Sequence, residues 1–129
     1  MYDLKLQKVN LKDKNEKQEV YRFLEGFGLI LDSDVDYTVV LRNLSGNIKA
    51  TCSKSKNIFK CFATSEDLRG QNVTASLISH LVDKLFEEGI FHSFIFTKAD
   101  KIKMFTSLNF KLLYQVEDAS LLEYGIYDI

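Results

Sequence analysis

The sequence has no proline, and its 129 residues include only two cysteines and two histidines. Without proline, Gly, Asn, Asp and Ser must mark the turns and the ends of helices and strands. No apolar run approaches the roughly 20 residues of a membrane-spanning helix. The first ten residues alternate polar and apolar side chains and lack the continuous apolar stretch of a signal peptide. We therefore expect a cytoplasmic protein that does not bind membranes.

The two cysteines, Cys52 and Cys61, match no metal-ligand spacing. Both lie in runs of strand-forming residues, and we interpret them as small buried hydrophobic side chains. A reduced compartment is consistent with this use of cysteine. We accordingly predict no metal site.

An excess of charge of one sign is also missing. The chain carries 17 basic and 18 acidic residues, for a net charge of -1, and the two signs alternate along the sequence. This pattern is typical of a solvated surface, so nucleic acid is not an expected partner. A content of 46% hydrophobic and 27% charged residues indicates a globular chain, and the length fits a single domain.

Hydrophobic periodicity predicts a mixed α/β domain. Asp13 and Glu16 form a capping-box pattern at the start of a first helix, which Gly26 and Gly28 end. A short helix over 101–108 is followed by Asn109 in a left-handed conformation. The buried face of the first helix is expected to hold Val20, Phe23, Leu24 and Phe27. A long helix over 73–88, stopped by Gly89, is expected to bury Val73, Leu77, Ile78, Leu81, Val82, Leu85 and Phe86. Strands are predicted over 2–9, 35–41, 48–52, 58–64, 91–97, 111–116 and 119–124.

A candidate anion site lies where strand 58–64 leads into the long helix. The first turn of a helix leaves backbone N–H groups unpaired, and a phosphate there is stabilised by them and by the helix dipole. Gly70 permits close approach of the backbone, and Arg69 adds a cation. On these features alone, an ordinary surface loop remains the alternative.

Several segments resemble the GNAT domain that opens the citrate lyase ligases. They are Asn57-Ile58-Phe59-Lys60-Cys61, Arg69-Gly70, His92-Ser93-Phe94-Ile95-Phe96-Thr97-Lys98, Asn109-Phe110 and Leu121-Leu122-Glu123. The resemblance covers about two-thirds of the chain in detail, and its Phe96-Thr97-Lys98 segment separates this family from ordinary GNAT enzymes. It implies the GNAT acyl-CoA N-acyltransferase fold, with a mixed central sheet of about seven strands and helices on both faces.

The resemblance also implies a binding site for CoA or a CoA-like prosthetic group. GNAT proteins hold the pyrophosphate on a loop of pattern Gln/Arg-x-x-Gly-x-Gly/Ala. Here Arg69 takes the first position, while Asn72 and Thr74 replace the two small residues, which predicts weak binding. Pantetheine lies between two splayed strands of this fold. The implied ligand-binding residues are Cys61, Phe62, Ala63, Thr64, Arg69, Gly70, Gln71, Asn72, Val73 and Thr74.

No catalytic residue is predicted. The tyrosine that protonates the thiolate product in N-acetyltransferases corresponds to Phe105, which has no proton to give. His80 falls on the polar side of the long helix and His92 begins its strand, and we assign neither a catalytic role.

Citrate lyase ligases use ATP and acetate to acetylate the thiol prosthetic group on the acyl carrier subunit of citrate lyase. By resemblance, that subunit and a C-terminal nucleotidyltransferase domain, which uses the ATP, are the expected partners. That domain is absent from residues 1–129, so this chain is expected to position the pantetheine thiol and to be inactive alone. The alternatives are a free-standing acetyltransferase that uses acetyl-CoA and a non-catalytic GNAT-fold interaction domain.

Overall fold

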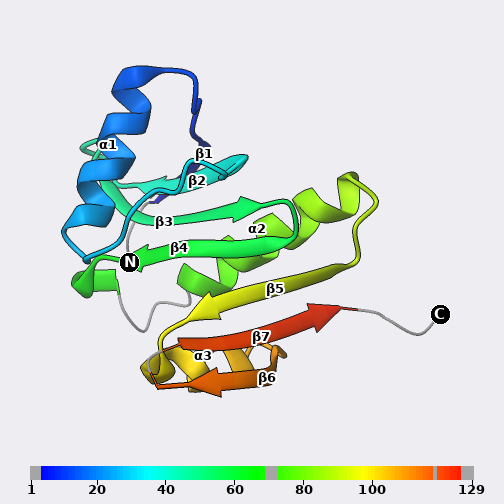
Figure 1. Ribbon diagram of the computed structural model, residues 1–129. Helices are drawn as coiled ribbons and strands as arrows, with labels where there is room; N and C mark the ends of the chain where they lie inside the picture. Colours follow the sequence, from blue (N-terminus) through cyan, green and yellow to red (C-terminus); the bar gives the residue numbers. More distant parts are fainter. Residues whose placement is uncertain (1–3, 69–72, 118, 126–129) are drawn as a thin grey trace.

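Seven strands form one sheet in the order β1-β2-β3-β4-β5-β7-β6 (Figure 1). This computed structural model describes residues 4–68, 73–117 and 119–125. The strands are β1 (Lys5–Lys8), β2 (Tyr37–Arg42), β3 (Ile48–Ser55), β4 (Ile58–Thr64), β5 (His92–Thr97), β6 (Lys111–Val116) and β7 (Ala119–Gly125). The helices are α1 (Lys14–Glu25), α2 (Val73–Glu87) and α3 (Ile102–Thr106), with short 3₁₀ turns η1 (Glu66–Leu68) and η2 (Ala99–Lys101).

Every neighbouring pair in this sheet is antiparallel except β4 and β5. The chain between these two parallel strands contains α2, which makes the crossover that a parallel pair requires. The mixed seven-stranded sheet predicted from the sequence is confirmed. Within the described ranges, no helix combines the length and hydropathy of a membrane span.

Helix α1 begins where the sequence predicts. The Asp13 carboxylate accepts hydrogen bonds from the backbone N–H groups of Asn15 and Glu16. Glu16 reaches back to the backbone N–H of Asn10 at 3.3 Å, so the capping box closes on a residue further upstream than expected. At the other end, Gly28 has φ +72° and lets the N–H of Leu29 bond to the carbonyl of Leu24, a left-handed helix end.

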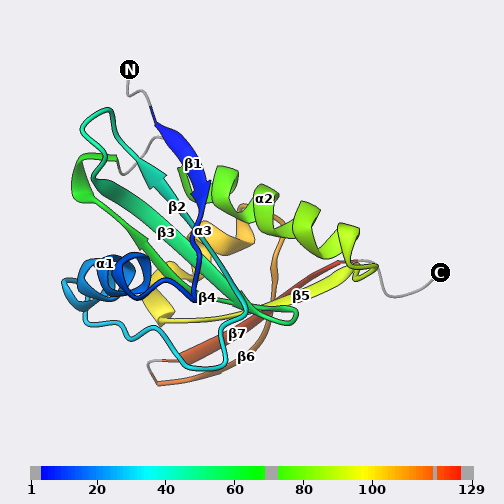
Figure 2. The ribbon, with the colours of Figure 1, turned by 90° about the horizontal axis from the view of Figure 1, so that it is seen from above.

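The two faces of the sheet carry separate hydrophobic clusters. Along β2, Val39 and Leu41 join the larger cluster with α2 and α3, while Val40 joins the smaller cluster with α1. Successive strand residues point to opposite faces, which explains this alternation. Helices thus cover both faces, as predicted, with α1 on one and α2 on the other (Figure 2).

Four side chains that the sequence places on buried helix faces are not fully buried. Phe23 and Phe27, expected on the buried face of the first helix, are only half-buried. Val82 is only half-buried, and Phe86 is 47% exposed, because the predicted stripe on α2 is wider than the face that the sheet covers. The Phe86 ring packs instead on Phe91, with ring centroids 5.2 Å apart.

The short helix differs from the predicted 101–108, since 99–101 forms a 3₁₀ turn before α3. Asn109 adopts the predicted left-handed conformation, with φ +72°.

Candidate functional site

The parallel pairing of β4 with β5 is short. Its register consists of Ile58 opposite Phe94 and Phe59 opposite Ile95. No later residue of β4 pairs with β5 in the described part of the chain, although β4 runs on to Thr64 and β5 to Thr97. The two strands therefore separate toward their carboxyl ends.

A β-bulge in β4 lies just past the last paired residue. Cys52 of β3 lies opposite both Cys61 and Phe62, because Thr51 pairs with Ala63 and Ser53 with Lys60. Cys61 has φ +59°, a left-handed conformation that is uncommon for a residue with a Cβ atom. The extra residue is a bulge that bends the strand and disrupts the ladder.

The bulge changes which face each side chain of β4 meets. Phe59 and Phe62 contact the α2 cluster. Cys61 contacts the α1 cluster, and the Lys60 ammonium bonds to the loop between α1 and β2 on that same side. Two consecutive residues thus point the same way, which strict alternation would not allow.

A cavity of about 610 Å³ occupies the space between the separating strands. Its wall includes members of both hydrophobic clusters: Phe27, Leu29, Cys61 and Ala63 from the α1 side, and Phe62, Leu68, Val73, Met104, Phe105 and Leu108 from the α2 side. Thr64, Thr74, Ala75, Phe96, Thr97, Lys98, Asp100, Lys101 and Ser107 complete it. The cavity therefore passes between the two faces of the sheet.

The structure brings together part of the predicted site. The cavity lining includes Cys61, Phe62, Ala63 and Thr64 on β4 together with Val73 and Thr74 on α2. Arg69, Gly70, Gln71 and Asn72 lie outside the described residues. That any of these residues binds a ligand stays a prediction.

Other lining residues were not found from the sequence. Leu29 lies at the cavity because the left-handed turn at Gly28 redirects the chain after α1. Phe96 and Lys98 stand in a segment that carried the family resemblance, and this was the one signal that pointed to them. Lys101 was placed only within a helix, with no indication of the face it occupies.

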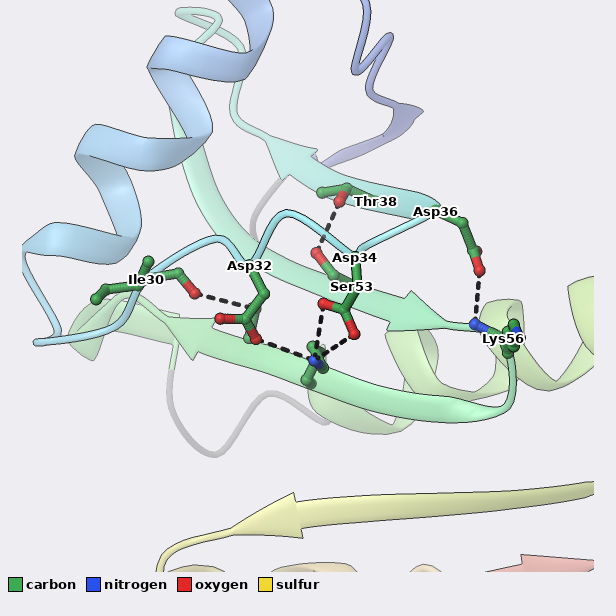
Figure 3. Close-up of polar contacts among 9 residues, drawn as sticks. Ile30, Asp32, Asp34, Asp36, Thr38, Ser53 and Lys56 are labelled. Carbon is green, nitrogen blue, oxygen red and sulfur yellow. Dashed lines mark hydrogen bonds and ion pairs between the residues drawn. The ribbon is translucent and has the colours of Figure 1, made fainter.

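The loop between α1 and β2 is fixed to β4 beside the cavity. The Lys60 ammonium bonds to Asp32 at 2.9 Å and to Asp34 at 3.3 Å, and Figure 3 shows both carboxylates pointing from the loop toward β4. The hydrogen bond from Lys60 lowers the pKa of Asp34. The Cys61 thiol donates to the carbonyl of Ile30 at 3.4 Å. Asp36, further along the loop, bonds to the backbone of Lys56.

The two cysteines differ in burial. Cys52 is fully buried, as interpreted from the sequence, but Cys61 is half-buried and lines the cavity. Burial raises the pKa of the Cys61 thiol. A thiol with a raised pKa is largely protonated at neutral pH and is a poor nucleophile.

Groups suited to acid–base catalysis are scarce around the cavity. Phe105 is fully buried against Phe62, with ring centroids 5.1 Å apart, and has no ionisable group. His80 and the Tyr37 hydroxyl share a hydrogen bond of 2.8 Å. His80 is half-buried, so the helix face on which it lies is less polar than predicted. His92 lies 3.3 Å from Glu123 on β7, and neither histidine lines the cavity. Among the residues described, no group of His, Cys, Asp or Glu could hold a metal ion.

Solved acetyltransferases share this architecture. An acyl-CoA N-acyltransferase from Pseudomonas aeruginosa matches with a TM-score of 0.78 and 11% identity, over 95% of this chain and 100% of that one. A GNAT-family acetyltransferase from Staphylococcus aureus matches with a TM-score of 0.74 and 14% identity, over 95% and 99% of the two chains. An N-acetylglutamate synthase from Neisseria gonorrhoeae gives 0.70 and 15%, over 99% of this chain and 36% of that one. The chain has the GNAT acyl-CoA N-acyltransferase fold, as predicted.

Sequence comparison finds relatives among the citrate lyase ligases. The citrate (pro-3S)-lyase ligase of Haemophilus influenzae is 36% identical over 101 residues, which are 78% of this chain and 29% of the relative. The same ligase from Klebsiella pneumoniae is 27% identical over 112 residues, 87% of this chain and 32% of the relative. No protein-family model matches the sequence. The chain is thus similar to citrate lyase ligases, as predicted, and spans about a third of the length of these curated relatives.

Proposed function

We propose that this chain is the N-terminal GNAT-like domain of a cytoplasmic citrate lyase ligase and that its cavity holds the pantetheine arm of the CoA-like prosthetic group. In this proposal the arm belongs to the acyl carrier subunit of citrate lyase, and its thiol receives acetate that a C-terminal nucleotidyltransferase domain has activated with ATP. The cavity between β4 and β5, in a chain similar to these ligases, is the observation that supports the proposal.

The cavity suits an extended arm that contains amide groups. Beyond Phe59, the β5 side of β4 has no strand partner among the described residues. Backbone N–H and C=O groups along a strand edge can pair with the amides of an extended ligand, as they do with an added peptide strand. Phe62 and Phe105 supply apolar surface for the methylene groups between the amides.

The contribution of this domain would be positioning. Holding a thiol in line with its reaction partner converts a bimolecular encounter into an effectively unimolecular one, which can supply about 7–11 kcal/mol of the barrier. The GNAT-fold neighbour from Neisseria gonorrhoeae was solved with coenzyme A, a pantetheine-containing ligand, which supports a ligand of this class for the fold.

The alternative function, acetylation of amines from acetyl-CoA, has less support than positioning of the pantetheine thiol. The lining residue at the usual acid position is Phe105, and the carboxylates of Asp32 and Asp34 beside β4 are already bonded to Lys60. Among the described residues, Asp100 supplies the one carboxylate in the lining, and it is exposed. We expect the chain alone to transfer no acetyl group from acetyl-CoA to a panel of amines and peptides. Turnover that disappears when the cavity is blocked would favour the acetyltransferase alternative.

Titration calorimetry with CoA tests the binding site. Thr64→Trp adds bulk inside the cavity, and Lys111→Trp adds the same side chain at an exposed position on β6 as a matched control. Thr64→Trp should weaken CoA binding at least tenfold, whereas the control should bind as the unmodified chain does. Thr74→Trp, at the start of α2, provides a second block if Thr64→Trp does not fold. Equal affinities in all folded variants would remove the cavity as the binding site.

A further inference from the structure

The strand β6 forms one edge of the described sheet. It stands last in the strand order, beside β7, and Figure 1 shows it along the lower margin of the sheet. All six of its residues are exposed. An edge strand presents a row of backbone N–H and C=O groups to solvent, and such a row can pair with a strand of another chain. The backbone of β6 is therefore available for strand addition.

Apolar side chains flank this edge on both faces of the sheet. Leu112 lies opposite Leu122, which belongs to the cluster with α2, whereas Tyr114 lies opposite Leu121, the neighbour of Leu122 on the other face. Tyr114 is 66% exposed and Val116 is 49% exposed. A strand added beside β6 would remove apolar surface from water on both faces, which favours association.

The opposite edge of the sheet carries a protection that β6 lacks. β1 is also exposed throughout, but Lys5 and Lys8 stand at its two ends. Charged side chains, lysine above all, keep edge strands from pairing with other chains. β6 has a single lysine, Lys111, and its bulge leaves the apolar side chain of Leu113 exposed. The sequence thus disfavours pairing at β1 and permits it at β6.

The charges at the two ends of β6 favour a second copy of this chain as the partner. Lys111 begins the strand and Glu117 directly follows it, and both are exposed. Neither takes part in a salt bridge within the described ranges. Antiparallel pairing of two β6 strands brings Lys111 of each copy close to Glu117 of the other, whereas parallel pairing would bring like charges together. Opposite charges across a strand pair are stabilising and like charges are destabilising.

We propose that two copies of this chain form a dimer through antiparallel pairing of their β6 strands, with a twofold axis through the middle of the strand. A contact between identical surfaces closes on itself, so the assembly ends at two copies. A single pair of short strands buries less area than a standard stable interface, so association is reversible. The cavity lies between β4 and β5, and β7 separates β5 from β6, so pairing leaves the cavity free. The inference therefore goes beyond the function proposed above and does not depend on it.

Sedimentation equilibrium from micromolar to millimolar concentration tests this interface. The weight-average mass should rise from 14.9 kDa toward that of two copies and no further. Tyr114→Lys places two like charges near the twofold axis and should weaken association about tenfold or more. Leu6→Lys, at an exposed apolar position on β1, is the matched control and should associate as the unmodified chain does. Leu113→Lys provides a second variant if Tyr114→Lys does not fold.

Two charge reversals test the antiparallel direction. Glu117→Lys and Lys111→Glu each place like charges at both ends of the paired strands, so each variant alone should associate more weakly than the unmodified chain. An equimolar mixture of the two variants should associate again, because the mixed dimer pairs a lysine with a glutamate at both ends. A contact elsewhere on the molecule would not show this recovery.

A monomer at every concentration would overturn the proposal. Assemblies larger than two copies would also overturn it, because they require pairing between different surfaces. A dimer that Tyr114→Lys leaves unchanged would place the contact on another surface. A mixture of the two charge reversals that stays as weakly associated as its components would rule out antiparallel pairing of β6.

Discussion

The ring of Phe105 on α3 meets the ring of Phe62 on β4 edge to face, with centroids 5.1 Å apart at an angle of 63°. Phe105 also contacts Phe110, which follows the left-handed residue Asn109 at the end of α3. Through these contacts the short α3 helix is attached to the strand that forms one wall of the cavity.

Phe105→Ala should lower the free energy of unfolding by about 3–5 kcal/mol, the usual loss when a fully buried aromatic ring is truncated. Phe105 has no exposed surface, whereas Phe86 is 47% exposed. Phe86→Ala is therefore the matched control and should cost much less. Urea denaturation of both variants measures the difference, and equal losses would show that α3 contributes little to the core.

Removing the two carboxylates that bind Lys54 should destabilise the fold more than removing the Lys54 ammonium itself. The Lys54 side chain is 2% exposed, and its ammonium binds Asp36 at 2.9 Å and Glu88 at 3.1 Å, joining the loop before β2 to the residue after α2. Lys54→Met leaves two carboxylates that are exposed enough to recover water, so we expect a loss below about 2 kcal/mol. Asp36→Asn with Glu88→Gln leaves a buried cation without an anion and should cost about 3 kcal/mol or more. Denaturant midpoints that place Lys54→Met as the less stable variant would contradict this order.

The ion pair between Glu19 and Arg42 should make stability depend on pH in the acid range. Two parallel hydrogen bonds of 2.6 and 2.7 Å join the groups, and they lower the pKa of Glu19 below its ordinary 4.5. A lowered carboxyl pKa stabilises the fold fully above 4.5, and this contribution is lost as pH falls through the folded-state value. Because Glu19 is 42% exposed, Glu19→Gln should cost only about 0.5–1 kcal/mol at neutral pH.

Unfolding curves of Glu19→Gln and the unmodified chain should therefore converge well below pH 4.5. Glu25→Gln, a second carboxyl change on α1, serves as the control. A gap between the curves that persists unchanged in acid would mean that packing, and not charge, sets the effect.

The two cysteines should react at different rates with iodoacetamide. Cys61 lines the cavity and Cys52 is fully buried, and burial raises the pKa of both thiols. Mass spectrometry should detect alkylation of Cys61 first, at a rate that increases with pH because the thiolate is the reactive form. CoA should slow the labelling if it occupies the cavity. Simultaneous labelling of both cysteines would indicate global unfolding.

Local sequence patterns predicted the elements well but not the bulge. The bounds of β4 and β6 match the expected 58–64 and 111–116, since strand propensity and flanking turn residues are local signals. The left-handed Asn109 is similarly local. The bulge at Cys61 depends on the register between β3 and β4, which no short pattern encodes. Simple alternation would have placed Cys61 and Lys60 on opposite faces.

The candidate site was predicted in part for the same reason. The sequence analysis singled out Cys61 to Thr64 because the family resemblance implies a ligand between two separated strands. The structure places all four residues at the cavity. Lys98 and Lys101 line the cavity as well, and they were missed because no local pattern shows that the segment after β5 turns toward it. Phe86 was predicted to be buried but is exposed. It lies on the apolar stripe of α2, and the sheet does not cover the full width of that stripe.

Because the cavity passes between the two faces of the sheet, the two ends of a bound arm would lie on different faces. An arm that filled it would have its attached carrier on one face and its reactive tip on the other, because residues of both clusters line the wall. The carrier that brings the arm and the group that acylates its tip would then dock at separate areas on opposite faces of the sheet. A carrier could remain seated while the acylating group arrives and departs, so the two encounters need not compete for one surface.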